Sequence, residues 1–293
     1  MNTRDDEPGA ECDSPRERRM GFWDHLNELR GTIIKSLITF AGFAALIGYY
    51  LNEFYHVLMW PFNSVALKYP HLLLELGTTS PMEAFNVIIQ MCFFGGLLLS
   101  APFVLFFVGQ FVAPALTNRE MKAVLPMCLA SLVLFLAGAA FGFFVLVPSA
   151  VRITIEINQS FGWAIRWTVD SYYTLLTRLV LGVGATFQFP LVIVLLVWLG
   201  LVSTAFLRKY RRHAIVAMFI VAAIVTPSTD PVQQTLLALP LVLLYEIAII
   251  MAARIEKRRE RSASAVILAL LALLPASRGG RAAGDGALAA ASH

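Results

Sequence analysis

The chain has 293 residues, of which 58% are apolar and only 14% are charged. Soluble domains are about a quarter charged, so this composition excludes an ordinary soluble enzyme and predicts an integral membrane protein. The three cysteines, Cys12, Cys92 and Cys128, show neither CxxC nor His-rich spacing. The sequence therefore indicates neither a disulfide framework nor a metal site, and we expect no cofactor.

Residues 1–21 are polar and are expected to form a tail, without a cleavable secretory signal; Met20 is an alternative start. Residues 22–254 are expected to form one membrane domain. A helix needs about 20 apolar residues to cross the hydrocarbon layer, and four segments reach that length. Two shorter segments follow. The expected spans are 31–51, 84–108, 124–147, 174–199, 214–226 and 235–253.

The last two expected spans are short. Residues 214–226 would reach only about 20 Å as a helix, against about 30 Å of hydrocarbon. The turn between the two spans, at 226–233, is rich in Pro, Ser and Asp. We therefore predict a short hairpin that thins the bilayer or draws polar groups inward.

The distribution of Lys and Arg predicts the orientation. Six crossings place both termini on one side, and nearly all the cations lie in the tails and loops of that side. By the positive-inside rule, both termini are expected to be cytoplasmic. The net charge of +4 then reflects membrane topology, and nucleic-acid binding is not expected. The cations expected on the outer face are Lys68, Arg152, Arg166 and Arg178.

The remaining segments carry weaker signals. The outer loops, about 52–83 and 148–173, are half apolar and are expected to contain short interfacial helices. Prolines inside spans predict curved or kinked helices. Residues 255–293 are expected to form a disordered cytoplasmic tail, because the apolar run at 265–274 is too short to span. The prolines concerned are at 102, 126, 190 and 240.

An amphipathic helix is predicted over Phe22–Arg30, running into the first span. Apolar residues recur there at helical spacing, and Asp24 and Glu28 share the opposite face one turn apart. Those carboxylates are either a solvated face or a binding site for a cation. A planar guanidinium would be the best match, because it forms two parallel charge-assisted hydrogen bonds with a carboxylate.

A second conspicuous segment, FVAPALTNRE, directly follows the second span. Pro114 is expected to stop the helix, while Phe111 and Leu116 pack back on the bundle. From the residues alone, Glu120 is an acid at the start of the third helix.

Polar groups also occur in or near the apolar spans. Gln188 and Glu246 are expected near mid-span, where an ionisable group is costly. Glu246 is therefore either a functional acid or a hydrogen-bonded structural one. At the hairpin turn, Asp230 is interpreted as a simple cap, beside Thr226 and Gln234.

The HLxELR segment at 25–30 and the F-x-x-P-x-L…E segment at 111–120 resemble the signature motifs of the TatC family. That family is the multi-spanning receptor subunit of the twin-arginine protein translocase. The resemblance runs from about Phe22 to Arg254 and implies a curved, concave bundle of six helices. It implies docking of single-span TatA- and TatB-type subunits at Thr226 and Gln234. The signal-peptide-binding residues that it implies are Glu28, Arg30, Phe111, Pro114, Leu116, Glu120 and Gln188.

The resemblance predicts a receptor and scaffold that binds twin-arginine signal peptides and exports folded proteins across the cytoplasmic (inner) membrane. It implies an oligomeric complex driven by the proton gradient, without a catalytic residue. No ATP-binding, HExxH or G-x-S-x-G motif is present in the sequence. The alternative is a proton-coupled transporter of a small solute with Glu246 as its relay, although no internal repeat supports that plan.

Overall fold

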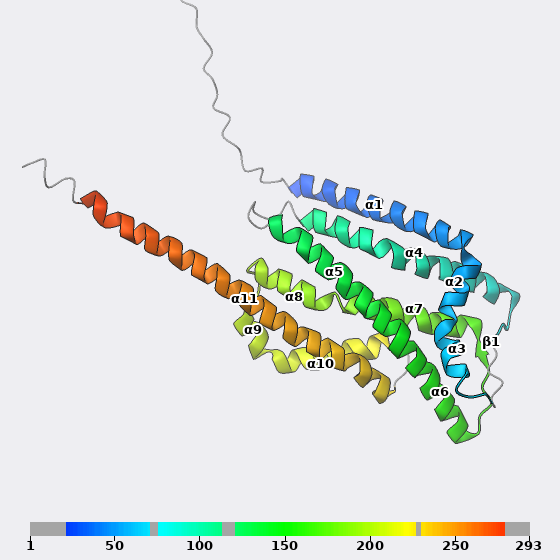
Figure 1. The fold of residues 1–293 in the computed structure, drawn as a ribbon. Helices are drawn as coiled ribbons and strands as arrows, with labels where there is room; N and C mark the ends of the chain where they lie inside the picture. Colours follow the sequence, from blue (N-terminus) through cyan, green and yellow to red (C-terminus); the bar gives the residue numbers. More distant parts are fainter. Residues whose placement is uncertain (1–21, 71–75, 113–120, 227–229, 279–293) are drawn as a thin grey trace, which may run out of the picture.

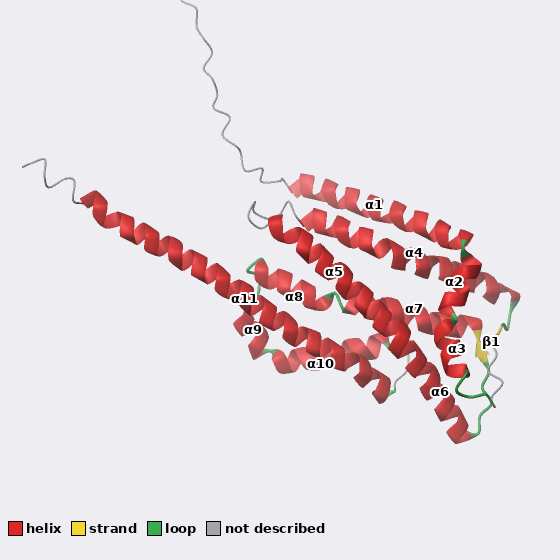
Figure 2. Cartoon of the chain, viewed as in Figure 1, coloured by secondary structure: helices red, strands yellow, loops and turns green. Residues whose placement is uncertain are grey.

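The computed structural model describes residues 22–70, 76–112, 121–226 and 230–278. Within these residues the protein is almost entirely helical (Figure 2). The only strands described there are β1 (Leu76–Gly77) and β2 (Trp167–Thr168), which pair in parallel with Leu76 opposite Trp167. The helical membrane fold predicted from the lengths of the apolar segments is confirmed.

The long helices run side by side along one direction (Figure 1). Five stretches in the described residues are long and apolar enough to cross a membrane. They are His25–Tyr49, Pro81–Phe111, Leu125–Phe161, Val169–Trp198 and Pro231–Lys257. They belong to α1 (Phe22–Tyr49), α4 (Pro81–Val112), α5 (Met121–Phe141) with α6 (Val147–Phe161), α7 (Val169–Thr186) with α8 (Phe189–Trp198), and α11 (Pro231–Arg278).

The fifth predicted span corresponds to α10 (Arg211–Val225), which pairs with α11 as a hairpin. It has 15 residues and is shorter than the other stretches, as expected from the sequence. The sixth span was also expected to be short, and that part of the prediction is wrong, because it belongs to the 27-residue apolar stretch Pro231–Lys257. Whether the chain crosses a membrane six times therefore stays a prediction. The start of α1 and the end of α11 lie at the same end of the molecule, in line with an even number of crossings (Figure 1).

The helix α1 forms one edge of the structure. It packs mainly on α4, and only 6% of its most apolar 18-residue stretch is buried. The two helices approach closely at Gly96, where an added Cβ would lie 2.8 Å from the Cβ of Ala44. Further in, α4 contacts α5 and α7, and α8 contacts α11. The chain thus forms a row of helices, and most of the surface of α1 is exposed and available to contact lipid.

The predicted short helices in the outer loops are present. They are α2 (Leu51–Leu58), α3 (Trp60–Ala66) and α6 (Val147–Phe161). We call the end of the molecule where they gather the cap end. There Tyr172 donates its hydroxyl to the carbonyl of Leu58 at 2.7 Å, and Asn86 donates to Asp170 at 2.5 Å.

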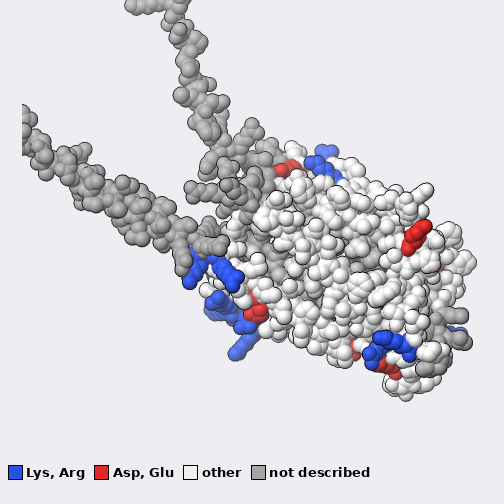
Figure 3. All heavy atoms as spheres, in the orientation of Figure 1, with Lys and Arg blue, Asp and Glu red and all other residues white. Residues whose placement is uncertain are grey.

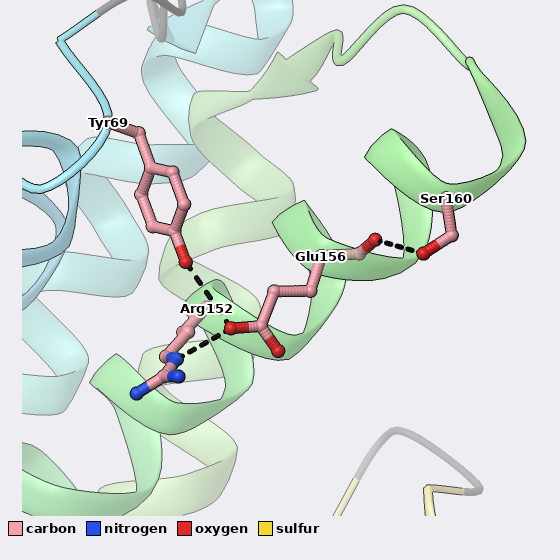
Figure 4. Close-up of polar contacts among 4 residues, drawn as sticks. All are labelled: Tyr69, Arg152, Glu156 and Ser160. Carbon is pink, nitrogen blue, oxygen red and sulfur yellow. Dashed lines mark hydrogen bonds and ion pairs between the residues drawn. The ribbon is translucent and has the colours of Figure 1, made fainter.

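Two carboxylates join further segments of the cap end. Glu83 accepts hydrogen bonds from the amide and hydroxyl of Thr79 at 2.6 and 2.8 Å and from the amide of Asp170 at 3.3 Å. On α6, Glu156 accepts from Arg152 at 2.7 Å and from the hydroxyl of Tyr69 at 3.3 Å (Figure 4). The first outer loop is therefore bound to the second at several points.

Proline does not interrupt most of the helices. Helices α4, α5 and α11 continue through the prolines at 102, 126 and 240. Only Pro190 coincides with a break, because α7 ends at Thr186 and α8 begins at Phe189. A π-helical segment, η2 (Gly142–Leu146), separates α5 from α6 just before Pro148 and was not predicted.

The prediction of a disordered tail from residue 255 is wrong for residues 255–278. Helix α11 continues without a break to Arg278 and extends beyond the other helices (Figure 1). Residues 255–274 contain no Gly or Pro and are rich in Ala, Leu, Glu and Arg, which favour helix. Because α11 is already formed, each added residue extends a helix without the cost of nucleating one. Residues 279–293 lie outside the described part.

Candidate functional site

Both sequence motifs reach the same end of the molecule, which we call the motif end. It comprises the first turns of α1, the last turn of α4 and the start of α5 (Figure 1). Helix α1 is continuous from Phe22, so the predicted amphipathic segment and the first span form one helix. The imidazole ring of His25 stacks on the ring of Phe111, with centroids 4.4 Å apart and planes at 21°. This contact joins the first motif to the second.

Glu28 lies one turn after His25 and is half-buried. Its Oε2 atom is shielded from solvent and has no hydrogen-bond partner within the described residues. A shielded carboxylate oxygen without a donor is costly, and a donor arriving from outside would remove that cost. An arginine guanidinium would do so best, because its planar fork matches a carboxylate.

Other members of the predicted site are less defined. Arg30 is exposed to the surroundings. Pro114, Leu116 and Glu120 lie outside the described residues, so the meeting of Glu120 with Glu28 stays a prediction. Met121, the next residue along the chain, begins α5 at the motif end.

Gln188 lies at the break between α7 and α8 and forms a reciprocal pair with Ser131 of α5. Its Oε1 accepts from the Ser131 hydroxyl at 2.8 Å, and its Nε2 donates to the Ser131 carbonyl, also at 2.8 Å. Both halves of the amide are thus used. Ser131 was missed from the sequence, although a hydroxyl within an otherwise apolar span is a signal for such a pairing.

Glu246 has a cationic partner that the sequence did not suggest. Arg211 Nε lies 2.5 Å from Glu246 Oε1, and the two side chains are 57% and 29% exposed. Arg211 is the first residue of α10 and precedes the expected fifth span, 214–226. The contact with the Arg211 guanidinium supports the structural interpretation of Glu246 over the alternative of a lone functional acid.

The polar residues of the hairpin are bonded within the protein. Thr226 is buried and donates to the carbonyl of Ala222 at 2.9 Å, and Gln234 donates to the carbonyl of Phe219 at 3.0 Å. Asp230 accepts from the amides of Val232 and Gln233, at 3.3 and 3.1 Å. It therefore caps the start of α11, as predicted.

Comparison with known proteins agrees with the motifs. The family described as "Sec-independent protein translocase protein (TatC)" matches residues 24–240. The protein of that name from Koribacter versatilis is 33% identical over 83% of this chain and 88% of its own length. The one from Aquifex aeolicus is 32% identical over 78% of this chain and 93% of its own length.

A solved structure also resembles this one. The crystal structure named "Twin Arginine Translocase Receptor- TatC" matches with a TM-score of 0.67 and 31% identity, over 79% of this chain and 99% of that one. These relatives are translocase proteins and not enzymes, and they favour the translocase over the solute transporter as the function. By the family match, sequence identity and shared fold, this chain belongs to the TatC family of Sec-independent protein translocase proteins.

Proposed function

We propose that this protein is the signal-peptide receptor and core scaffold of a twin-arginine translocase that exports folded proteins. The observation that carries the proposal is the shielded Glu28 Oε2, which lacks a donor within the described residues. The ring stack of His25 on Phe111 holds this part of α1 against α4. A guanidinium from the signal peptide would supply the missing donor.

Binding by two carboxylates would give the specificity for paired arginines. In the proposal, Glu28 binds one arginine and Glu120 the other, while Phe111, Pro114 and Leu116 shape the surface between them. A charge-assisted hydrogen bond contributes about 1.5–3 kcal/mol, so two Arg–carboxylate pairs could favour paired arginines over other residues by several kcal/mol. Lysine carries the same charge as a compact ammonium and loses the planar fork.

The orientation follows from the positive-inside rule: both termini and the motif end face the cytoplasm, at the inner membrane. The apolar part of the signal peptide would then enter the concave bundle beside Gln188. Arg30 is exposed at the entrance and would contact the peptide from the flank. The proton gradient would drive transport, as the resemblance to the TatC family implies.

Single-span TatA- and TatB-type subunits are proposed to dock on the short hairpin of α10 and α11, in an oligomeric complex. Thr226 and Gln234 are already bonded to carbonyls of α10. A partner helix with its own polar residue could exchange one of these bonds while packing along the hairpin.

Site-specific crosslinking tests the receptor role. A photoreactive residue at position 111 is expected to crosslink a twin-arginine precursor in membranes. Glu28→Ala and Glu120→Ala should each lower the yield, and a precursor with paired lysines should bind worse. Glu53→Ala, at an exposed acid of α2 in the cap end, is the matched control and should leave the yield unchanged. A wild-type yield in the Glu28→Ala/Glu120→Ala double variant would refute the assignment.

A further inference from the structure

A large apolar cavity lies between α8, α9 (Thr204–Lys209), α10 and α11. Its volume is about 660 Å³, and its walls are almost entirely apolar. Three polar residues that border it are already hydrogen-bonded within the protein: Thr186 donates to the carbonyl of Gly182, Gln188 is paired with Ser131, and the hydroxyl of Tyr245 donates to the carbonyl of Leu207 at 3.1 Å. An occupant of the cavity would therefore be held there by hydrocarbon contacts.

One side of the cavity is bordered by aromatic residues next to cations. Tyr210 and His213 line it, and their ring centroids are 5.6 Å apart. The Lys209 ammonium lies 5.9 Å from the centroid of the Tyr210 ring. At least one cation is thus fixed at the rim of an apolar cavity.

The residues that adjoin Tyr210 and His213 in sequence, which we call the rim, carry an excess of positive charge. Arg208, Lys209 and Arg212 are exposed, and no ion pair within the described residues includes any of them. Arg211, between them in sequence, is the one that is neutralised, by Glu246. Figure 3 shows Lys and Arg side chains gathered at the end of the molecule where α9 and the start of α10 lie.

We propose that this cavity binds an anionic phospholipid, with an acyl chain in the cavity and the phosphate on the rim of Lys209, Arg212 and His213. Basic sites between helices at the cytoplasmic side suit anionic headgroups, and a zwitterionic headgroup would bring a repelled ammonium to the same rim. The size of the cavity favours a chain over a helix. A helix about 10 Å wide that rises 1.5 Å per residue would fill this volume with only about six residues.

Native mass spectrometry of the purified protein tests the proposal, with dioleoylphosphatidylglycerol and dioleoylphosphatidylcholine as probes. We expect the anionic lipid to bind more tightly. Each rim cation removed should weaken it roughly fivefold, so Lys209→Gln/Arg212→Gln should weaken it on the order of 25-fold. The control Lys68→Gln/Arg166→Gln removes two exposed cations elsewhere and should leave binding unchanged. Arg212→Lys keeps the charge and should retain binding.

The cavity itself is tested separately from its rim. Ala217 lines the cavity, whereas Val216, its exposed neighbour on α10, does not. Ala217→Phe should therefore reduce lipid binding, and Val216→Phe should not. Glycerophosphoglycerol, the headgroup without acyl chains, should not bind detectably.

Three results would overturn the proposal: equal binding of both lipids, equal losses in the test and control variants, or tight binding of the chainless headgroup. Unchanged melting temperatures in the variants would exclude unfolding as the cause of a loss. Because Gln188 borders the cavity, a bound signal peptide should also displace the lipid if the proposed receptor role holds. Lipid selectivity can be measured without any peptide, so the two ideas can fail independently.

Discussion

The ion pair between Arg211 and Glu246 predicts a defined coupling between two helices. Arg211→Gln, Glu246→Gln and the double variant form a double-mutant cycle. The pair is close, with 2.5 Å between Nε and Oε1, but the two side chains are 57% and 29% exposed. Exposed pairs contribute about 0.2–1 kcal/mol, whereas breaking a buried one costs about 3–5 kcal/mol. We therefore expect a coupling energy near the top of the exposed range, about 1 kcal/mol.

Denaturant unfolding in mixed micelles would give the coupling energy. The matched control pairs Glu246→Gln with Arg254→Gln, an exposed cation on the same helix, and should show no coupling. The same variants separate a structural acid from a proton relay. If the ion pair is structural, the Arg211→Gln/Glu246→Gln variant leaves no lone charge. It should then export precursor proteins at least as well as Glu246→Gln does. Zero coupling, together with export abolished by Glu246→Gln in a fully stable protein, would refute the structural interpretation.

Three further predictions concern packing and polar contacts. Gly96→Ala should destabilise the protein by about 1–3 kcal/mol in thermal unfolding, because the new Cβ would lie 2.9 Å from the Cα of Ala44. The control Gly42→Ala adds a Cβ that has no neighbouring atom within 4 Å, and it should be neutral or slightly stabilising. Gln188→Leu removes the two hydrogen bonds to Ser131, worth about 0.6 kcal/mol each, and should lower the melting temperature of the protein modestly. An unchanged melting temperature would contradict the reciprocal pair. Glu83→Gln should speed hydrogen exchange at the backbone amide of Thr79, which now donates to the Glu83 carboxylate. Equal exchange rates in the two proteins would count against that hydrogen bond.

Much of the fold followed from the sequence because hydrophobic length is a local property. The predicted spans 31–51 and 84–108 lie almost entirely within α1 and α4, and the short length of α10 was expected from its apolar run. The interruptions were less predictable. The break after α7 lies where Phe187 packs closely on Gly138 of α5. A Cβ added to Gly138 would lie only 2.7 Å from the Cγ of Phe187. Such contacts join residues distant in sequence, and helical periodicity does not contain them.

The candidate site was predictable in part, for a related reason. The spacing of Asp24 and Glu28 placed them on one helix face but left open whether that face was solvated. The shielding of Glu28 Oε2 depends on what packs around α1, which only the structure supplies. For Glu246, the partner lies 35 residues earlier in sequence, and the register of the α10–α11 hairpin decides that they meet. The sequence contained both charges but not that register.

The two ends of the molecule differ in a way that suits a receptor. At the cap end, polar groups are bonded across loops distant in sequence: Tyr172 to Leu58, and Tyr69 to Glu156. At the motif end, the described contact between the two motifs is a ring stack, beside a carboxylate oxygen that lacks a donor. Hydrogen bonds between distant loops resist rearrangement, whereas the Glu28 oxygen gains free energy when a donor reaches it. Stability held at the cap end would thus allow the motif end to keep an unmet hydrogen bond for the signal peptide that we propose it binds.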